Sequence, residues 1–341
     1  MVCFRQRRRV FLFSLALILI TGVLPASARA QEPEDVIRTE SDVTNVLFTA
    51  SDKQKRLITT LREEDLRVLE DGVPQKLFTF QRETDRPLSI AFLIDVSASE
   101  ERTLPNEKAA ARTFIETILR SNKDQAAIIP FTDYAYLEQP LTNNVLGIYQ
   151  ALQSVEVALP SYVGKGAPIS GIVSRPGGIS EPREGSTAIW DAVTVTSREI
   201  LARSRGQRRR AIILLTDGED TSSRTSKNQA IDSALEYETV IYVIGIGDSR
   251  YAGVKKDTLK DVAERTGGRS FFPGKGADLT AAFLEIEKEL RSQYLLAYSS
   301  TNKNRNGAFR QTVIEIVDPE LRKELTLRYR PGYFAKPLNS K

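Results

Sequence analysis

The feature that most constrains this chain is a series of apolar runs that alternate with helical patterns through its middle. The runs at 88–94, 126–131, 211–216 and 240–244 are mostly apolar and rich in Ile, Leu and Val. Runs of this kind are typical of strands that are buried on both faces of a parallel sheet. Apolar residues at helical spacing mark the stretches between and after them, at 110–119, 148–155, 188–202, 226–236, 255–265 and 277–291. The alternation predicts an α/β domain on a doubly wound, mainly parallel sheet.

Both flanks of this region carry β patterns instead. Strand candidates lie at 43–48, 66–69, 77–80, 294–298, 312–317 and 325–329. The turn Asp71-Gly72 between the second and third of these predicts a hairpin. We expect the N-terminal segment 31–86 and the C-terminal segment 293–341 to pair into one small β-sandwich, with the α/β domain of residues 87–292 inserted between them.

Residues 1–30 have the pattern of a signal peptide that is removed on secretion. A segment with four arginines precedes the apolar run 10–24, which is short for a membrane span. Ala-Arg-Ala at 28–30 follows with the small-x-small pattern of a cleavage site. We therefore expect cleavage after Ala30 and a protein that is secreted, periplasmic or held in the cell envelope. The alternative is an uncleaved segment that anchors the chain to a membrane.

Composition excludes several classes of function. Without residues 1–30 the chain has 43 basic and 44 acidic residues, so its formal net charge falls from +4 to about −1 and does not indicate nucleic-acid binding. The single cysteine, Cys3, lies in the leader, so no disulfide is expected. The chain has no histidine, which excludes a Ser-His-Asp triad, a Cys-His pair and the usual His-rich zinc site. A metal site would need oxygen ligands, which favour Mg²⁺, Mn²⁺ or Ca²⁺.

Oxygen-bearing side chains cluster at three places. Asp95, Ser97 and Ser99 follow one predicted buried strand, Asp217 follows another, and Thr187 opens a helix after a long loop. In a doubly wound sheet the carboxyl ends of the strands gather at one edge, where ligands bind. In an extended segment the side chains of 95, 97 and 99 point to one side. The sequence therefore predicts a shared set of two carboxylates and three hydroxyls for a hard dication.

These five residues carry a family resemblance. Asp95, Ser97 and Ser99 form an Asp-x-Ser-x-Ser motif, Thr187 lies in Gly-Ser-Thr-Ala, and Asp217 lies in Thr-Asp-Gly. In order and spacing they resemble the metal-ion-dependent adhesion site (MIDAS) of von Willebrand factor A (VWA) domains. The resemblance implies that the three hydroxyls contact Mg²⁺, or else Mn²⁺ or Ca²⁺, while the two carboxylates often bind it through water. It also implies an open coordination position for an Asp or Glu side chain of a protein partner.

The resemblance covers about 87–292, and it extends to the flanks. The segments 70–75 and 330–335 look like those of bacterial secreted VWA-related proteins. The resemblance implies a Rossmann-like VWA fold and a secreted adhesion or scaffold module that is not an enzyme. Because neutral hydroxyls leave the cation electrophilic, the cation can attract an acidic side chain from another protein.

The chain also departs from the family pattern. Glu100 stands where many members have an apolar residue, often Met, and Glu219 and Asp220 add acids beside Asp217. Higher metal affinity, a second cation site and repulsion of an acidic ligand are all open consequences. The Gly/Pro/Ser-rich insertion at 157–186 either covers the site or forms part of the binding face.

Two other functions compete with the metal-dependent module. One is a metal-independent interaction module whose β-structure makes the contacts. The other is a Mg²⁺-dependent phosphohydrolase with Asp95 as nucleophile. That chemistry usually has a second acid where Ser97 stands, and the chain has no histidine and no evident paired general acid.

Structural explanations compete with the functional ones at single positions. Asp95 and its neighbours could form a polar turn with satisfied hydrogen bonds, and Thr187 taken alone is a typical helix N-cap. Glu219 and Asp220 are typical of a solvated loop. The basic run 208–210 is expected as a solvated turn before a strand, and Trp190 as core packing.

Overall fold

The computed structural model describes residues 43–82, 85–157, 167–169, 186–204, 208–246, 253–274 and 276–337. The predicted signal peptide at 1–30, its cleavage site and most of the 157–186 insertion lie outside the described residues. Among the helices that are described, none is long and apolar enough to cross a membrane.

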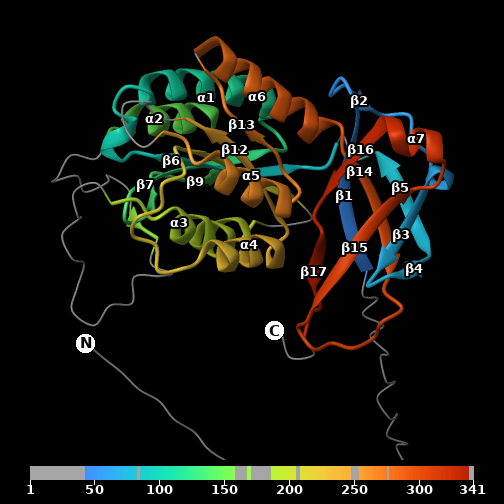
Figure 1. Ribbon diagram of the computed structural model, residues 1–341. Helices are drawn as coiled ribbons and strands as arrows, with labels where there is room; N and C mark the ends of the chain where they lie inside the picture. Colours follow the sequence, from blue (N-terminus) through green and yellow to red (C-terminus); the bar gives the residue numbers. More distant parts are fainter. Residues whose placement is uncertain are drawn as a thin grey trace, which may run out of the picture. The chain divides into compact units, whose positions relative to one another are not determined.

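A six-stranded sheet forms the centre of the α/β region (Figure 1). Its strands, in spatial order, are β13 (Ser270–Phe271), β12 (Thr239–Gly245), β11 (Arg209–Thr216), β6 (Leu88–Asp95), β7 (Gln125–Phe131) and β9 (Gln139–Thr142). The five from β13 to β7 are parallel, and β9 pairs antiparallel with β7 at the edge. All eight residues of β6 are buried, as its apolar run predicts for a central strand. Next to the sheet, β8 (Tyr136–Leu137) pairs with β10 (Ala167–Pro168).

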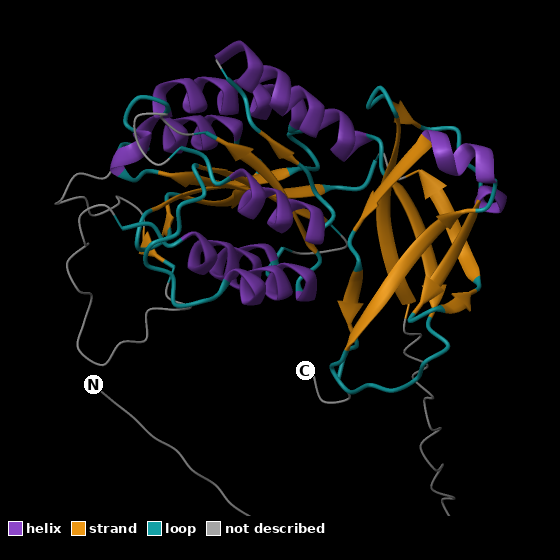
Figure 2. Cartoon of the chain, in the orientation of Figure 1, coloured by secondary structure: helices purple, strands orange, loops and turns teal. Residues whose placement is uncertain are grey.

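Helices cover both faces of this sheet (Figure 2). On one face lie α1 (Leu104–Ile118), α2 (Val145–Ser154) and α6 (Gly276–Arg291); on the other lie α3 (Ile189–Val195, continued by a π-helical segment to Leu201), α4 (Lys227–Glu236) and α5 (Lys256–Arg265). Successive side chains of a strand point to opposite faces. Ile90 and Phe92 of β6 therefore pack with the first group, and Ala91 and Leu93 with the second. Trp190 of α3 is 6% exposed and lies in the second cluster, which confirms it as a core residue.

The two ends of the described chain pair with each other in two further sheets. The first has the order β16 (Leu325–Tyr329), β1 (Val43–Asp52), β14 (Tyr294–Ser299) and β5 (Leu77–Arg82), with β2 (Leu57–Ile58) beside β1. The second has the order β17 (Gly332–Phe334), β15 (Phe309–Ile316), β3 (Leu66–Glu70) and β4 (Val73–Gln75), and α7 (Pro319–Glu324) precedes β16. One hydrophobic cluster joins both sheets: Phe48 stacks on Tyr294 with ring centroids 4.9 Å apart, and Val68 and Ile314 come from the second sheet.

The predicted hairpin at 66–80 differs in its second strand. Asp71 and Gly72, with φ of +48° and +81°, do form a tight turn, but this turn joins β3 to the short edge strand β4. The segment that was expected to complete the hairpin, β5, pairs with β14 instead, with Phe80 opposite Leu296. Local turn chemistry predicted the turn correctly, whereas the partner of β5 depends on a strand more than 200 residues away.

The prediction of a solvated basic turn at 208–210 is wrong. Arg209 is 4% exposed in β11, and its guanidinium donates to the Gln293 side chain at 3.0 Å and to the carbonyl of Leu290. Arg208 donates to the carbonyl of Lys123 at 2.5 Å. These acceptors lie at a helix end and beside a strand end, where carbonyls lack partners of their own, so buried guanidinium groups satisfy them.

Candidate metal centre

The candidate site begins where β6 ends, between β7 and β11. Asp95 is the last residue of β6 and is fully buried. Its Oδ1 accepts hydrogen bonds from the backbone N–H and the hydroxyl of Ser97, at 3.0 and 2.7 Å. Its Oδ2 accepts one from the hydroxyl of Thr216, the last residue of β11, at 2.6 Å. The carboxylate is therefore held in one orientation by both neighbouring chain segments.

The loop after Asp95 is a turn and not the extended segment expected from the spacing of 95, 97 and 99. Ser97 is extended, but Ala98–Glu100 is a 3-10 turn in which the N–H of Glu100 donates to the carbonyl of Ser97 at 3.0 Å. The carboxylate of Asp95 stabilises this turn by accepting from the backbone two residues on. The turn still brings the two hydroxyls together, with 3.1 Å between Ser97 Oγ and Ser99 Oγ.

Asp217 completes a connected group of side chains. It follows β11 and is 8% exposed, and its Oδ1 accepts from the N–H of Glu219 at 2.9 Å. The hydroxyl of Ser99 hydrogen-bonds to its carboxylate. Asp95, Ser97, Ser99 and Asp217 thus form one continuous hydrogen-bonded set at the ends of two strands, and their role as metal ligands stays a prediction.

Thr187 reaches the same edge through its backbone. It is 5% exposed, and its N–H donates to the hydroxyl of Thr221 at 2.9 Å. Its carbonyl accepts from the N–H groups of Thr221 and Ser222 at 2.9 and 3.1 Å, and the next N–H, of Ala188, donates to the carbonyl of Thr132. These bonds tie Thr187 to the loops that follow β11 and β7, on either side of the Asp95 loop.

Thr187 does not act as the helix N-cap that it would resemble if taken alone. The N-cap of α3 is Ala188, and Asp220 supplies the capping group from a distant loop. Asp220 Oδ1 accepts from the N–H of Ile189 at 2.8 Å, and Ser223 Oγ accepts from that of Trp190 at 3.0 Å. The prediction of a solvated loop is therefore wrong for Asp220, because its carboxylate caps a helix that begins 31 residues earlier in the chain.

Two buried glutamates beside the site were not predicted as part of it. Glu100 is fully buried, and Glu107 of α1 is 1% exposed. One carboxylate oxygen of each of Asp95, Glu100 and Asp217 lies within 4.8 Å of the other two. The sequence held a signal for Glu107, because this acid falls on the apolar stripe of α1 that continues with Ala110, Ala111 and Phe114.

The electrostatics of this group favour a bound cation. Burial raises the pKa of Asp95 to about 6, against the hydrogen bonds from Thr216 and Ser97, and burial also raises the pKa of Asp217. Burial and neighbouring carboxylates raise the pKa of both Glu100 and Glu107. Within the described part of the chain, no lysine or arginine forms an ion pair with Asp95, Glu100 or Glu107. Oxygen donors with unbalanced negative charge match the preference of a hard dication.

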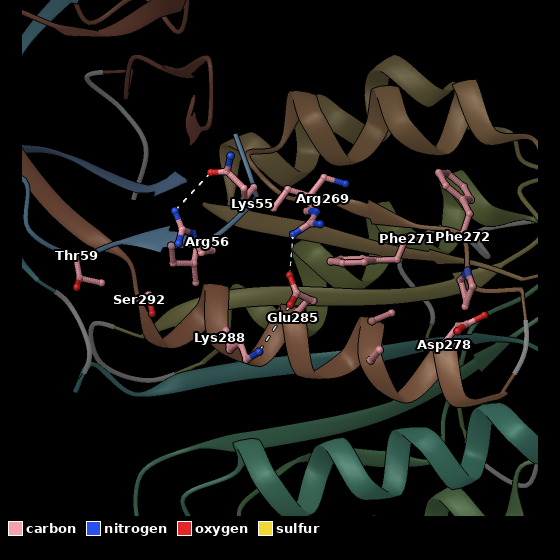
Figure 3. A pocket seen from close by; sticks show the side chains of 15 residues that line it. Lys55, Arg56, Thr59, Arg269, Phe271, Phe272, Asp278, Glu285, Lys288 and Ser292 are labelled. Carbon is pink, nitrogen blue, oxygen red and sulfur yellow. Dashed lines mark hydrogen bonds and ion pairs between the residues drawn. The ribbon is translucent and has the colours of Figure 1, made fainter. Parts of the chain in front are cut away.

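A pocket lined by residues of both the α/β region and the N-terminal β segment does not include this site. It has a volume of about 800 Å³ and is lined by residues of 54–59, 269–273 and 278–292 (Figure 3). Its charged groups partly neutralise each other: Glu285 lies 3.4 Å from Arg269 and 3.8 Å from Lys288. The candidate metal centre is therefore a mostly buried edge of the sheet and not this cavity.

Comparison with known proteins identifies the family to which this sequence belongs. The profile of the von Willebrand factor type A domain matches residues 89–283, more than half of the chain and all five predicted site residues. No curated protein matches the chain significantly.

Solved structures from several organisms match parts of this chain. Proximal thread matrix protein 1 of the mussel byssus, in a structure with a zinc-occupied MIDAS motif, is 19% identical with a TM-score of 0.49 and matches 65% of this chain and 50% of its own. A von Willebrand factor type A protein of Catenulispora acidiphila is 14% identical with a TM-score of 0.47, over 89% and 76% of the two chains. BatB of Bacteroides thetaiotaomicron is 19% identical with a TM-score of 0.43, over 60% and 100%. This chain thus spans about half the length of the mussel protein.

Proposed function

Because the chain belongs to the von Willebrand factor type A domain family, whose members are mostly interaction modules rather than enzymes, we propose that it is a metal-dependent protein-binding module. A divalent cation at the Asp95 edge would form the binding contact. The observation that carries the proposal is the group of buried carboxylates at this edge. Among the described residues, no lysine or arginine forms an ion pair with Asp95, which lies at the centre of this proposed site. A buried negative charge without a partner is costly, and a dication relieves that cost.

Five residues would hold the cation, which we propose to be Mg²⁺, with Mn²⁺ or Ca²⁺ as alternatives. The hydroxyls of Ser97, Ser99 and Thr187 would contact it, and the carboxylates of Asp95 and Asp217 would bind it directly or through water. The hydrogen-bonded set of Asp95, Ser97, Ser99 and Asp217 supports this role, because a preorganised ligand set needs little rearrangement to bind a cation.

The partner would be a protein that offers an Asp or Glu carboxylate to the cation. Most of the site is buried, but Ser99 is partly exposed and Ala98 is exposed, so the turn presents one side to solvent. Secretion through the leader at 1–30 is part of the proposal, and so are a doubly wound α/β domain and a β-sandwich of the flanks. Helices on both faces of the main sheet and the core shared by the flanking sheets support these last two.

The test of the metal site is thermal unfolding of the full chain with chelator and then with Mg²⁺, Mn²⁺ or Ca²⁺. A cation at about 100 times its Kd adds roughly 2.7 kcal/mol, which raises the Tm of a domain of this size by roughly 5 to 10 °C. The shift should vanish in Asp95→Ala and persist in Glu320→Gln, which removes an exposed acid of α7. An equal shift in wild type and Asp95→Ala would place the cation elsewhere.

The partner class is tested with acetate as the simplest carboxylate. Manganese-loaded protein should bind acetate, and chelated protein or Asp95→Ala should not, because the contact runs through the cation. Acetate binding that survives chelation would favour the metal-independent module instead.

A further inference from the structure

Glu100 lies on the buried side of the proposed metal site. It ends the 3-10 turn that carries Ser99, and its side chain is fully buried while Ala98 of the same turn is exposed. One of its carboxylate oxygens lies within 4.8 Å of a carboxylate oxygen of both Asp95 and Asp217. The turn therefore directs the Glu100 side chain toward the interior of the site, while Ser99 lies at the partly exposed edge.

The carboxylate of Glu100 is only half satisfied. Its Oε2 accepts a hydrogen bond from the hydroxyl of Thr103 at 2.5 Å. Its Oε1 is buried and has no hydrogen-bond partner within the described residues. Buried carboxylate oxygens normally have a partner, because leaving one without any forfeits the solvation it has in water. An oxygen in this position, beside two other carboxylates, indicates that a ligand is still to be supplied.

The polar surroundings of Glu100 offer no positive group to supply that partner. Glu107 is close, but it is also an acid, so the only partner it offers Glu100 is a proton shared between the two buried carboxyl groups, which a dication would displace. Lys255 lies 3.9 Å from the more exposed Glu219, and its charge acts on Asp217 but forms no ion pair with Glu100. A cation from solution is therefore the partner that this set of oxygens lacks.

We propose that Glu100 is a sixth metal-binding residue of this site, and that it contributes a carboxylate from the interior. The inference rests on the proposed metal site and deepens it. With Glu100, three carboxylates face a dication, so the complex keeps a net negative charge. The site then binds its cation more tightly, and attracts a carboxylate of a partner less strongly, than the five predicted residues would by themselves.

The first experiment measures the affinity of the full chain for Mn²⁺ by calorimetric titration. Glu100→Gln keeps the size of the side chain and its acceptor for Thr103 but removes the charge, so Mn²⁺ affinity should fall by about 10- to 100-fold. Glu219→Gln is the matched control: it removes a neighbouring, partly exposed acid, and its affinity should stay within about threefold of wild type. Thermal unfolding in chelator verifies that Glu100→Gln is folded.

The second experiment distinguishes a ligand from a nearby charge. Eu³⁺ in the same site reports the total charge of its ligands through its excitation line, and its bound waters through emission lifetimes in H₂O and D₂O. In Glu100→Gln the line should shift and more water should be bound, since a carboxylate has left the coordination shell. An unchanged Eu³⁺ spectrum overturns the proposal whatever the Mn²⁺ affinity.

Failure of this inference is separable from failure of the proposed function. If Asp95→Ala loses Mn²⁺ while Glu100→Gln binds it as wild type does, the site stands and Glu100 is a structural acid that bonds Thr103. If wild type binds neither Mn²⁺ nor Eu³⁺, the proposed function itself is wrong and the role of Glu100 falls with it.

Discussion

Two buried carboxylates at opposite ends of the same sheet have opposite surroundings. Asp124 precedes β7 and is fully buried, and it accepts hydrogen bonds from Arg120 at 2.9 Å, Arg291 at 3.0 Å and the N–H of Leu88 at 2.8 Å. Asp95 ends the neighbouring strand and is just as buried, but its donors are hydroxyls and one N–H. One end of the sheet has balanced charges, and the other end does not.

The difference shows that the partner, and not burial, decides the state of a buried acid. Burial acts to raise the pKa of both groups. Hydrogen bonds from Arg120, Leu88 and Arg291 nevertheless lower the pKa of Asp124 to about 2, whereas the pKa of Asp95 rises to about 6. A structural acid is therefore neutralised by the protein itself. The acids at the Asp95 edge have no such internal partner, and for this reason we propose that a cation from solution neutralises them.

The largest expected loss of stability follows from a substitution at the end of the sheet where the charges are balanced. Asp124→Asn should lower the free energy of unfolding by about 4 kcal/mol, because two guanidinium groups lose the charge they face. Asp95→Asn, measured in chelator, should change it by less than about 1 kcal/mol, because removing an unbalanced buried charge offsets the weakened hydrogen bonds. Denaturant unfolding of both variants gives the comparison. Equal losses in the two would mean that the ends do not differ in the way described.

The pH dependence of stability sharpens the same contrast. The pKa of Asp95 in the folded state, about 6, lies above the usual aspartate value of 3.8, so the folded protein binds the proton more tightly. Its contribution to stability is present below pH 4 and is lost as pH rises through 6, by on the order of 3 kcal/mol. Asp124 has the opposite sign, since its lowered pKa gives stability that is lost as pH falls below 4.

The measurement is the difference in unfolding free energy between wild type and Asp95→Asn, in chelator, from pH 4 to 7. Wild type should lose stability relative to the variant across this range, and saturating Mn²⁺ should remove the loss. A difference that is flat with pH would show that Asp95 is ionised throughout.

A smaller effect concerns the hydrogen bond between Thr216 and Asp95. Thr216→Val should destabilise the protein by about 2 kcal/mol above pH 7 in chelator, because Asp95 loses a close donor and the N–H of Gly218 loses its acceptor. Ser89→Ala in β6 is the matched control, since the buried Ser89 hydroxyl has no partner within the described residues and should be dispensable. Urea unfolding at two pH values checks both. A loss as large in Ser89→Ala would contradict the assignment.

The smallest effect is expected at the rim of the site. Glu219→Gln should change the unfolding free energy by less than about 0.5 kcal/mol, because Glu219 is partly exposed and its contact with Lys255 is 3.9 Å long. Thermal unfolding in chelator measures it. A loss above about 1 kcal/mol would show that the unbalanced charge extends beyond the buried carboxylates.

Much of the fold was predictable because its signals are local. The residue types of the apolar runs predict that β6, β7, β11 and β12 are buried. The Asp71-Gly72 turn was predictable because Asp and Gly readily adopt the positive φ that this turn requires. The partner of β5 was not predictable in this way, because several strands with the same alternation compete for it. The buried role of Arg209 was also missed, since its acceptors belong to a distant helix end.

For the site, the sequence by itself determined which residues stand at the strand ends: Asp95, Ser97 and Ser99 after one run and Asp217 after another. Only the tertiary structure decided what surrounds them. Thr216 meets Asp95 across 121 residues of chain, Asp220 caps α3 beside Thr187, and Glu100 turns inward. The reason is physical: residue type and spacing are written along the chain, but the charge balance of a buried group depends on which distant segments packing brings beside it.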